Sequence, residues 1–378
     1  MDAKAIARIV EKKSKWIQDH IQDLVQQESP SEDRQAVNAA VALVEPWAQE
    51  QGARIKRYKQ TEFGDVLELR FGAPRSKHKP VLLLGHLDTV WPMGTLKNMR
   101  WRKADGRYWG PGVLDMKAGV VMALAALDTL REMKLSRPVT LLLNSDEEVG
   151  SPISRAITER LALESAAVFV LEPAQGLAYK TARKGVGQYH VEVTGVGAHS
   201  GVDFEKGHSA ILELAKQVQT ISGFTNLARK LTVNCGVIAG GTRSNVVASQ
   251  AWTEVDVRIA RASDAGHVEK LFRSLRVSDP HCELTITGGI NRPPMERKPG
   301  TLALFKKASS KAAELGFVLE EAATGGGSDG NFTAALGVPT LDGMGAVGDG
   351  AHAAHESVVI EHLVPRTALL AAMIASVE

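Results

Sequence analysis

The sequence predicts an α/β fold in which a mixed, mostly parallel sheet has helices on both faces and carries an inserted α+β domain. Two patterns predict it. Near both ends of the chain, continuous apolar runs alternate with helical patterns, which is typical of buried parallel strands joined by helices. In the middle, apolar and polar residues alternate along the strands, as in an antiparallel sheet with one face in solvent. A chain of 378 residues is also long for one core, so we expect two domains.

The parallel pattern occupies the first part of the chain. Apolar residues at helical spacing predict one helix from about residue 4 to residue 28, and Ser29-Pro30-Ser31 ends it. A second helix is expected from about residue 33 to residue 51, before Gly52. The other elements predicted in this part are strands at 66–71, 81–85, 139–144 and 166–171 and a helix at 117–134.

The middle of the chain reads as an insertion. Its predicted elements are alternating strands at 188–195, 231–238 and 251–259 and helices at 209–221 and 264–275. The first pattern returns after Pro293-Pro294, with a helix at 302–315 and a glycine-rich turn at 325–330. We therefore expect residues 1–182 and 293–378 to form one discontinuous domain, and residues 183–292 to form the inserted domain.

Charge and composition exclude several classes of protein. The chain has 45 basic and 43 acidic residues and a net charge of +2, so no electrostatic feature favours nucleic acid or a membrane surface as a partner. Cys235 and Cys282 form no CxxC motif, which excludes a thiolate zinc site. The N-terminal segment has no apolar signal-peptide core and no run of about 20 apolar residues occurs. We expect a cytoplasmic protein, with a mature periplasmic form as the alternative.

Acidic and imidazole side chains recur where apolar runs end or glycine-rich turns begin. In an α/β sheet these positions meet outside the carboxyl ends of the strands. Carboxylates with imidazoles suit Zn²⁺ and its neighbours. Five ligands are too many for one catalytic zinc, which keeps an open position, and they fit two metals that share a carboxylate. The candidates are His86, Asp115, one of the pair Glu147-Glu148, Glu172 and His352.

Two short motifs indicate how such a site would work. In His86-Leu87-Asp88, the carboxylate of Asp88 can accept the second ring N–H of His86 and so fix the tautomer. Adjacent residues in extended backbone point to opposite sides, so one of Glu147 and Glu148 can bind metal while the other faces the substrate as a general base.

Each candidate also has a structural explanation when it is taken alone. His86 can be a buried core histidine, Asp115 can be a helix N-cap, and the acidic pair can belong to a solvated loop. In the turn at 348–356, the residues by themselves do not decide between His352 and His355. The prediction of a metal site therefore rests on the set as a whole.

Four segments, in order, closely resemble the co-catalytic zinc family of glutamate carboxypeptidases, aminoacylases, acetylornithine deacetylases and succinyl-diaminopimelate desuccinylases. They are residues 85–90 (GHLDTV), 110–119 (GPGVLDMKAG), 146–151 (DEEVGS) and 197–201 (GAHSG). The resemblance covers nearly the whole chain. It implies a zinc-exopeptidase-like fold whose inserted domain, built on a four-stranded antiparallel sheet, serves as a lid and dimerises the protein.

The resemblance also implies a role for each candidate in the first domain, with two Zn²⁺ ions per subunit and Co²⁺ or Mn²⁺ as substitutes. Family members usually carry the last ligand four residues before a glutamate; His352 stands four before Glu356, which favours it over His355. The implied roles are a bridging ligand (Asp115), terminal ligands (His86, Glu172, Glu148, His352), a general base (Glu147) and an orienting carboxylate (Asp88).

In the inserted domain, the resemblance implies residues that complete the substrate site. His199 resembles a histidine that reaches a neighbouring subunit's site and donates to the oxyanion, which implies a homodimer. Asn245 and Arg258 resemble residues that bind the substrate carbonyl and carboxylate, and Arg292 is a second candidate for the carboxylate. Gly326 is expected to line the substrate pocket.

We therefore expect a di-zinc hydrolase that cleaves an amide or peptide bond beside a free carboxylate, most simply a carboxypeptidase that releases a C-terminal amino acid such as glutamate. An N-acyl amino acid deacylase of the acetylornithine deacetylase or aminoacylase type is the main alternative. The substrate would be a small peptide or an N-acyl amino acid. A metal-free binding module is a further alternative. So is a di-zinc aminopeptidase of related fold, although the resemblance implies that those enzymes lack the inserted domain.

Overall fold

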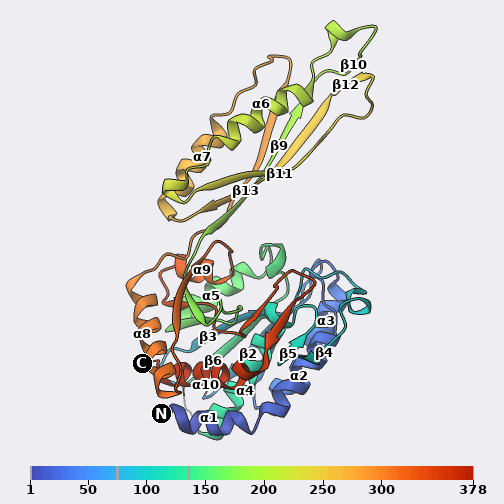
Figure 1. The fold of residues 1–378 in the computed structure, drawn as a ribbon. Helices are drawn as coiled ribbons and strands as arrows, with labels where there is room; N and C mark the ends of the chain where they lie inside the picture. Colours follow the sequence, from blue (N-terminus) through green and yellow to red (C-terminus); the bar gives the residue numbers. More distant parts are fainter. Residues whose placement is uncertain (1, 74–75, 135–136, 378) are drawn as a thin grey trace. The chain divides into compact units, whose positions relative to one another are not determined.

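The computed structural model describes residues 2–73, 76–134 and 137–377. The chain folds into two compact units (Figure 1). The first unit comprises Met1–Ala182, Arg297–Ala323 and Ser328–Glu378, and the second comprises Arg183–Glu296 and Thr324–Gly327. The second unit thus extends past residue 292 and also takes in part of the glycine-rich turn. Among the described residues, no helix combines the length and the apolar character needed to cross a membrane.

The first unit is built on a six-stranded sheet in the order β1-β2-β6-β3-β7-β16. β3 is parallel to β6 and β7, and β7 is parallel to β16, whereas β1–β2 and β2–β6 are antiparallel. The predicted mixed, mostly parallel sheet is confirmed. The strands are β1 (Arg54–Tyr58), β2 (Val66–Phe71), β3 (Val81–His86), β6 (Val139–Asn144), β7 (Ala167–Val170) and β16 (Thr340–Leu341).

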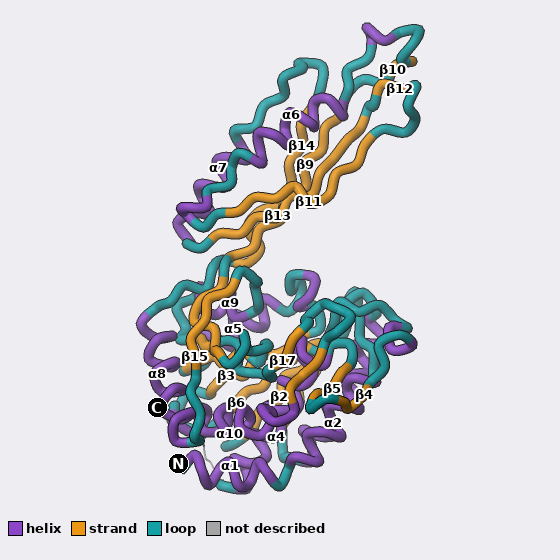
Figure 2. Tube along the Cα trace, in the orientation of Figure 1, coloured by secondary structure: helices purple, strands orange, loops and turns teal. Residues whose placement is uncertain are grey.

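Helices cover this sheet, and their apolar faces form its core (Figure 2). α4 is buried along nearly its whole length, which explains its alanine-rich sequence. Asp33 begins α3 by accepting hydrogen bonds from the amides of Gln35 and Ala36, each at 3.0 Å. The helices are α1 (Ala3–Glu11), α2 (Ser14–Gln26), α3 (Arg34–Glu50), α4 (Ala118–Glu132), α5 (Arg155–Glu164), α8 (Pro299–Glu314), α9 (Gly330–Ala335) and α10 (Ile360–Ser376).

The prediction of one helix from 4 to 28 is wrong, because the segment forms α1 and α2 with a break between them. At the break, the ammonium group of Lys13 binds Asp128 and Glu132 near the end of α4. The sequence hides the break because buried apolar residues keep helical spacing on both sides of it.

A small second sheet in the same unit has the order β17-β18-β5-β4, with β4 (Arg102–Ala104), β5 (Arg107–Trp109), β17 (Gly348–Asp349) and β18 (Ser357–Val359). β8 (Ala178–Arg183), which ends at the first residue of the second unit, pairs with β15 (Glu320–Thr324).

The second unit confirms the predicted four-stranded antiparallel sheet, in the order β11-β13-β9-β14. α6 (Ala210–Ser222) and α7 (Ala265–Arg273) pack on one face of this sheet and bury its apolar side chains. The strands are β9 (Gly185–Thr194), β11 (Thr232–Gly240), β13 (Gln250–Ile259) and β14 (Glu283–Arg292). At one end of this unit, β10 (Ala198–His199) and β12 (Val246–Val247) form a two-stranded ribbon.

Candidate metal centre

Three parallel strands end at the same edge of the first unit's sheet and supply most of the predicted site. His86 is the last residue of β3, and the loop with Glu147 and Glu148 follows β6. Glu172 follows β7 by two residues. Gly119, near the start of α4, lies against the end of β7, because a Cβ at this position would sit 2.3 Å from the oxygen of Leu171. The absence of a side chain there lets the start of α4, just after Asp115, lie close to the end of β7.

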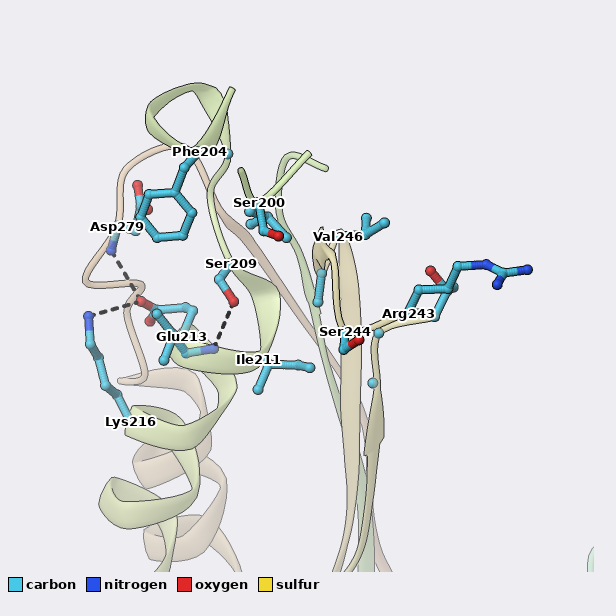
Figure 3. Close-up of a pocket in the computed structure, with 17 residues that line it drawn as sticks. Ser200, Phe204, Ser209, Ile211, Glu213, Lys216, Arg243, Ser244, Val246 and Asp279 are labelled. Atoms are coloured by element: carbon cyan, nitrogen blue, oxygen red, sulfur yellow. Dashed lines mark hydrogen bonds and ion pairs between the residues drawn. The ribbon is translucent and has the colours of Figure 1, made fainter. Parts of the chain in front are cut away.

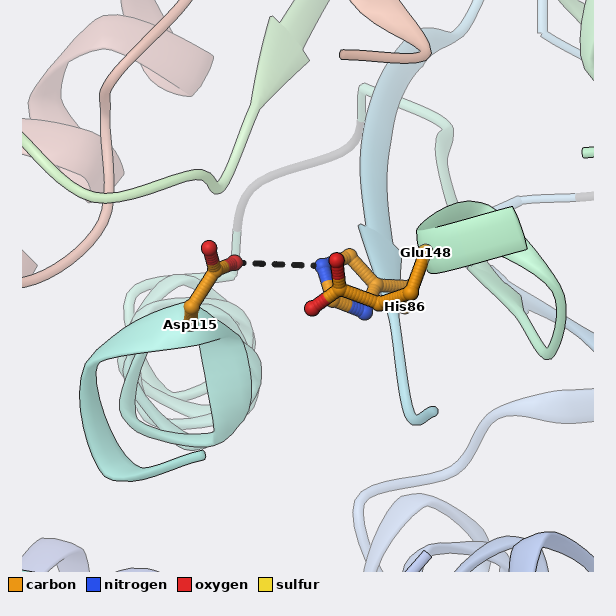
Figure 4. Close-up of side chains that lie close together, drawn as sticks. All are labelled: His86, Asp115 and Glu148. Carbon is orange, nitrogen blue, oxygen red and sulfur yellow. Dashed lines mark hydrogen bonds and ion pairs between the residues drawn. The ribbon is translucent and has the colours of Figure 1, made fainter. Parts of the chain in front are cut away.

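Asp115 lies between the two histidines. Its Oδ1 is 3.3 Å from Nε2 of His86, and its Oδ2 is 3.4 Å from Nε2 of His352. Figure 4 shows His86, Asp115 and Glu148 turned toward one another. One carboxylate that faces two imidazoles with different oxygens is the arrangement required of a bridging ligand.

The other acids divide between the two histidines. Oε1 of Glu172 is 3.7 Å from Nε2 of His86, and Oε2 of Glu148 is 3.2 Å from Nε2 of His352. Ligand atoms of His86, Asp115 and Glu148 all lie within 4.8 Å of one another, as do those of His86, Glu147 and Glu172. The structure therefore brings together all six residues predicted at the metal centre. A carboxylate oxygen of Glu147 thus comes as close to His86 as a ligand would.

The structure also distinguishes His352 from His355. His352 has a left-handed backbone (φ 61°), and its Nε2 is in contact with Asp115 and Glu148. The ring of His355 packs against Gly350 instead, where an added Cβ would lie 2.8 Å from its Cδ2. The geometry thus favours His352.

The electrostatics of the cluster fit a divalent cation. Burial opposes protonation of His86, but hydrogen bonds to Asp115, Asp88 and Glu172 outweigh burial and raise its pKa well above the usual value. Hydrogen bonds to Asp115 and Glu148 raise the pKa of His352 to about 10. Burial, together with the charge of Asp115, raises the pKa of Glu148 to about 8. The carboxylates thus favour the protonated, positively charged form of both imidazoles, and Glu148 resists ionisation beside Asp115. Both effects indicate an excess of negative charge in the pocket, which bound metal ions would balance.

Asp88 has a broader task than the predicted one. Nδ1 of His86 lies 2.9 Å from the backbone oxygen of Asp88 and 3.4 Å from its carboxylate. The carboxylate accepts the amides of Glu147 and Glu148 at 3.2 and 3.1 Å and the hydroxyl of Ser31 at 2.7 Å. Asp88 therefore ties the His86 strand to the loop that carries both glutamates.

Sequence reasoning gave Glu356 no role, yet it holds the Asp115 loop. Its buried carboxylate accepts the amides of Gly112 and Leu114, each at 2.8 Å, and of Asp115 at 3.1 Å. It also accepts Nε1 of Trp91 at 2.8 Å. The only signal in the sequence was its position four residues after His352.

We expect Glu356→Gln to weaken metal binding about 10- to 100-fold, as replacement of groups that orient ligands typically does. The reason is geometric. Each carboxylate oxygen accepts two N–H donors, so the NH₂ group of glutamine would face two donors in place of one oxygen. Competition with a chelator measures the affinity, and exposed Glu361 on α10 offers the control Glu361→Gln. Equal metal affinity in both variants would contradict this role.

The predicted residues of the second unit form two separate groups. His199 pairs with Val246 beside Asn245, whose backbone oxygen accepts the amide of Ser200 at 3.0 Å. Arg258, near the far end of β13, binds Asp256 at 2.8 Å and faces the oxygen of Gly325 at 3.5 Å. The eight steps from Gln250 to Arg258 span about 27 Å in a strand. The structure thus does not bring His199 and Asn245 to Arg258 and Gly326 within this unit.

Buried arginines join the second of these groups. Arg183 donates to the oxygens of Gly326 and Gly327 at 3.3 and 2.9 Å. The side chain of Arg292 packs against Gly327, where an added Cβ would lie 3.0 Å from its Cδ.

A separate cavity of about 800 Å³ lies beside the His199 ribbon and is lined only by residues of the second unit (Figure 3). Its buried carboxylate, Glu213, binds the amides of Ser278 and Asp279 and is thus used within the unit.

A family model described as peptidase family M20/M25/M40 matches residues 82–376, a span that contains every residue of the metal centre. The chain belongs to this family. Carboxypeptidase G2 from Pseudomonas sp. (strain RS-16) is 28% identical over 361 residues, which cover 93% of this chain and 86% of the relative. Acetylornithine deacetylase from Myxococcus xanthus is 29% identical over 54% of this chain and 56% of its own. As an M20 member, the protein is a metal-dependent hydrolase, as predicted.

Solved M20-like structures share the fold. The M20 family metallo-carboxypeptidase Sso-CP2 from Sulfolobus solfataricus has a TM-score of 0.72 at 15% identity and covers 94% of this chain and 97% of its own. Aminopeptidase PepT from Bacillus cereus has a TM-score of 0.77 at 20% identity, and the match covers 96% of this chain and 98% of the PepT chain. This second likeness corrects one expectation: an aminopeptidase matches nearly the whole chain, so the inserted domain does not by itself exclude that activity.

Proposed function

We propose that this M20 protein is a di-zinc carboxypeptidase that releases a C-terminal amino acid such as glutamate from a small peptide or N-acyl substrate. The observation that carries the proposal is the position of Asp115, with one oxygen toward His86 and the other toward His352. Glu172 lies beside His86, and Glu148 lies beside His352. This arrangement supports two ions that share one carboxylate. The match to carboxypeptidase G2 over 93% of the chain supports the choice of reaction.

When bound, the ions would acidify a water and polarise the scissile carbonyl. Glu147 accepts the proton as the water attacks, and it returns this proton to the leaving nitrogen as the C–N bond breaks. His199 donates a hydrogen bond to the oxyanion. The amide of Gly201 donates to Nδ1 of His199 at 3.1 Å, so the proton of the neutral ring lies on Nε2, the atom left to donate.

The arginines around Gly325–Gly327 support recognition of a free carboxylate. Arg258 keeps its fork oriented through two bonds to Asp256, and Arg183 and Arg292 surround the same turn. Guanidinium forks match carboxylates in geometry and charge. We assign the carboxylate to Arg258, with Arg292 as the second candidate.

A substrate panel tests the function. Glutamyl dipeptides, N-acyl glutamates, acetylornithine and amidated controls are compared by kcat/KM, together with metal content per chain. Two metals per chain and hydrolysis that disappears when the substrate carboxylate is amidated support the carboxypeptidase. Preference for N-acetyl groups over peptides would favour the deacylase, which the partial match to acetylornithine deacetylase makes the second candidate. If the protein bound no metal and hydrolysed no substrate of the panel, the metal-free binding module would be the interpretation that fits.

We also propose that the enzyme works as a homodimer joined through its second unit. His199 and Asn245 lie at the β10–β12 ribbon, which comes before β13 begins at Gln250, and Arg258 lies about 27 Å further along β13. This is too far for both groups of one chain to contact one small substrate. A second copy could supply the distal group. The open edge strand β11 exposes Val237 and Ile238, which are 52% and 61% accessible, as expected of a surface that another chain covers.

Mixing two inactive variants tests the shared site. His199→Ala and Glu147→Ala should each be inactive alone, and after subunit exchange they should recover about a quarter of wild-type activity per chain. Half of the randomly formed dimers are mixed, and each has one intact site. Light scattering gives the oligomeric state, and Glu254→Ala on the solvent face of β13 serves as a surface control. Absence of recovery despite verified exchange would rule out the shared site.

A further inference from the structure

The glycine-rich turn ends in a buried aspartate that does not belong to the metal centre. Gly325–Gly327 lie in the second unit, whereas Ser328 onward lies in the first. Asp329 is only 3% exposed. Its Oδ2 accepts Nδ2 of Asn144 at 2.6 Å, and its Oδ1 accepts the hydroxyl of Ser151 in a short hydrogen bond. Both partners are fully buried as well, so these bonds are shielded from water.

The two partners of Asp329 stand at the two ends of one loop. Asn144 is the last residue of β6, and Ser151 follows Glu147–Val149 and Gly150. Residues 145–150 therefore form a loop that Asp329 closes at its base. Ser151 has a left-handed backbone with φ 59°, which is uncommon for a residue other than glycine. Hydrogen bonds to its side chain help to hold this conformation.

The same loop is held on its other side by Asp88, which accepts the amides of Glu147 and Glu148. The loop thus lies between two carboxylates: Asp88, two residues after β3, and Asp329, 178 residues beyond Ser151. Catalytic groups must be held to within about 0.5 Å of their productive geometry by packing and by hydrogen bonds to neighbouring residues.

We propose that Asp329 is a positioning residue that places Glu147 and Glu148 through its bonds to Asn144 and Ser151. The inference rests on the proposed function, in which these two glutamates act as base and ligand. It assigns a task within the first unit to a turn that the sequence suggested only as a wall of the substrate pocket.

The first test is Asp329→Asn, whose NH₂ group would face the donor on Asn144 or Ser151 in place of an acceptor. We expect kcat to fall about 10- to 100-fold, as for other residues that orient ligands. KM should stay within about twofold of the wild-type value, because Asp329 makes no contact with the substrate in this proposal. The visible spectrum of the Co²⁺-substituted protein should shift, because Glu148 would move relative to the metal.

A matched control separates positioning from general stability. Thr158→Val removes another buried hydrogen bond of the same network, from Nδ2 of Asn144 at 3.0 Å, without touching the link to Ser151. It should lower the melting temperature but leave kcat and the Co²⁺ spectrum unchanged. Equal effects of the two variants on kcat and spectrum would overturn the proposal.

Ser151→Ala removes the same link from the loop side and serves if Asp329→Asn does not fold. It should shift the Co²⁺ spectrum in the same direction, and the double variant should be no worse than Asp329→Asn alone. Additive losses would overturn the proposal. The spectrum does not depend on the substrate, so a wild-type protein inactive on the whole panel would contradict the proposed function and still leave positioning decided by the spectrum.

Discussion

Replacing Glu147 by alanine should leave both metals in place and lower kcat by about 10²- to 10⁴-fold, the usual contribution of a general base. Glu147 follows a buried strand, and its backbone amide is fixed by Asp88. The side chain can therefore change while the loop stays in position. Metal analysis and steady-state kinetics on the best substrate measure the two quantities separately.

Glu147→Asp is the informative control, because it keeps the carboxylate and shortens its reach by one methylene. It should retain more activity than the alanine variant. Because a carboxylate oxygen of Glu147 lies within 4.8 Å of ligand atoms of His86 and Glu172, a different outcome is also defined. Loss of one metal from Glu147→Ala would make Glu147 a ligand and contradict its assignment as the base.

The second large effect is expected at Asp115. Asp115→Ala removes the carboxylate that faces both histidines, so both metal positions should weaken together, and kcat/KM should fall at least about 100-fold. Glu172→Ala should weaken mainly the position beside His86. Titration of apo-protein with Zn²⁺ distinguishes the loss of two sites from the loss of one.

The control for Asp115 is Asp128→Asn in α4, an acid paired with Lys13 and Arg131 rather than with a histidine. It should bind two metals with unchanged affinity. If Asp115→Ala kept one site at full affinity, the bridging role would be wrong and each histidine would need its own set of ligands.

Much of the metal centre could be predicted because its residues follow strong local patterns. β3 and β6 are continuous apolar runs, and parallel strands bring their carboxyl ends together. Asp329 and Glu356 could not be found in this way. Their partners lie 178 to 265 residues away, and no periodicity connects a buried acceptor to a distant backbone amide or hydroxyl.

Other features were hidden by competing local signals. Strand β14 was not predicted from its own residues, because Gly288-Gly289 interrupts its alternation and both glycines have positive φ. α10 carries Pro365 in its first turns, which hides a helix that is otherwise strongly apolar. Arg258 was predicted to bind substrate, but the sequence did not show that Asp256, on the same face of β13, already holds its guanidinium.

The order of the ligands along the chain has a consequence for synthesis on the ribosome. His86, Asp115, Glu148 and Glu172 are translated before the whole second unit, whereas His352 and Glu356 come after it. A nascent chain that has just completed the second unit therefore contains four of the five proposed ligands, and the loop of Asp115 still lacks the carboxylate that holds it. The metal position beside His352 would therefore be completed only after the second unit has been translated, later than the position beside His86 and Glu172.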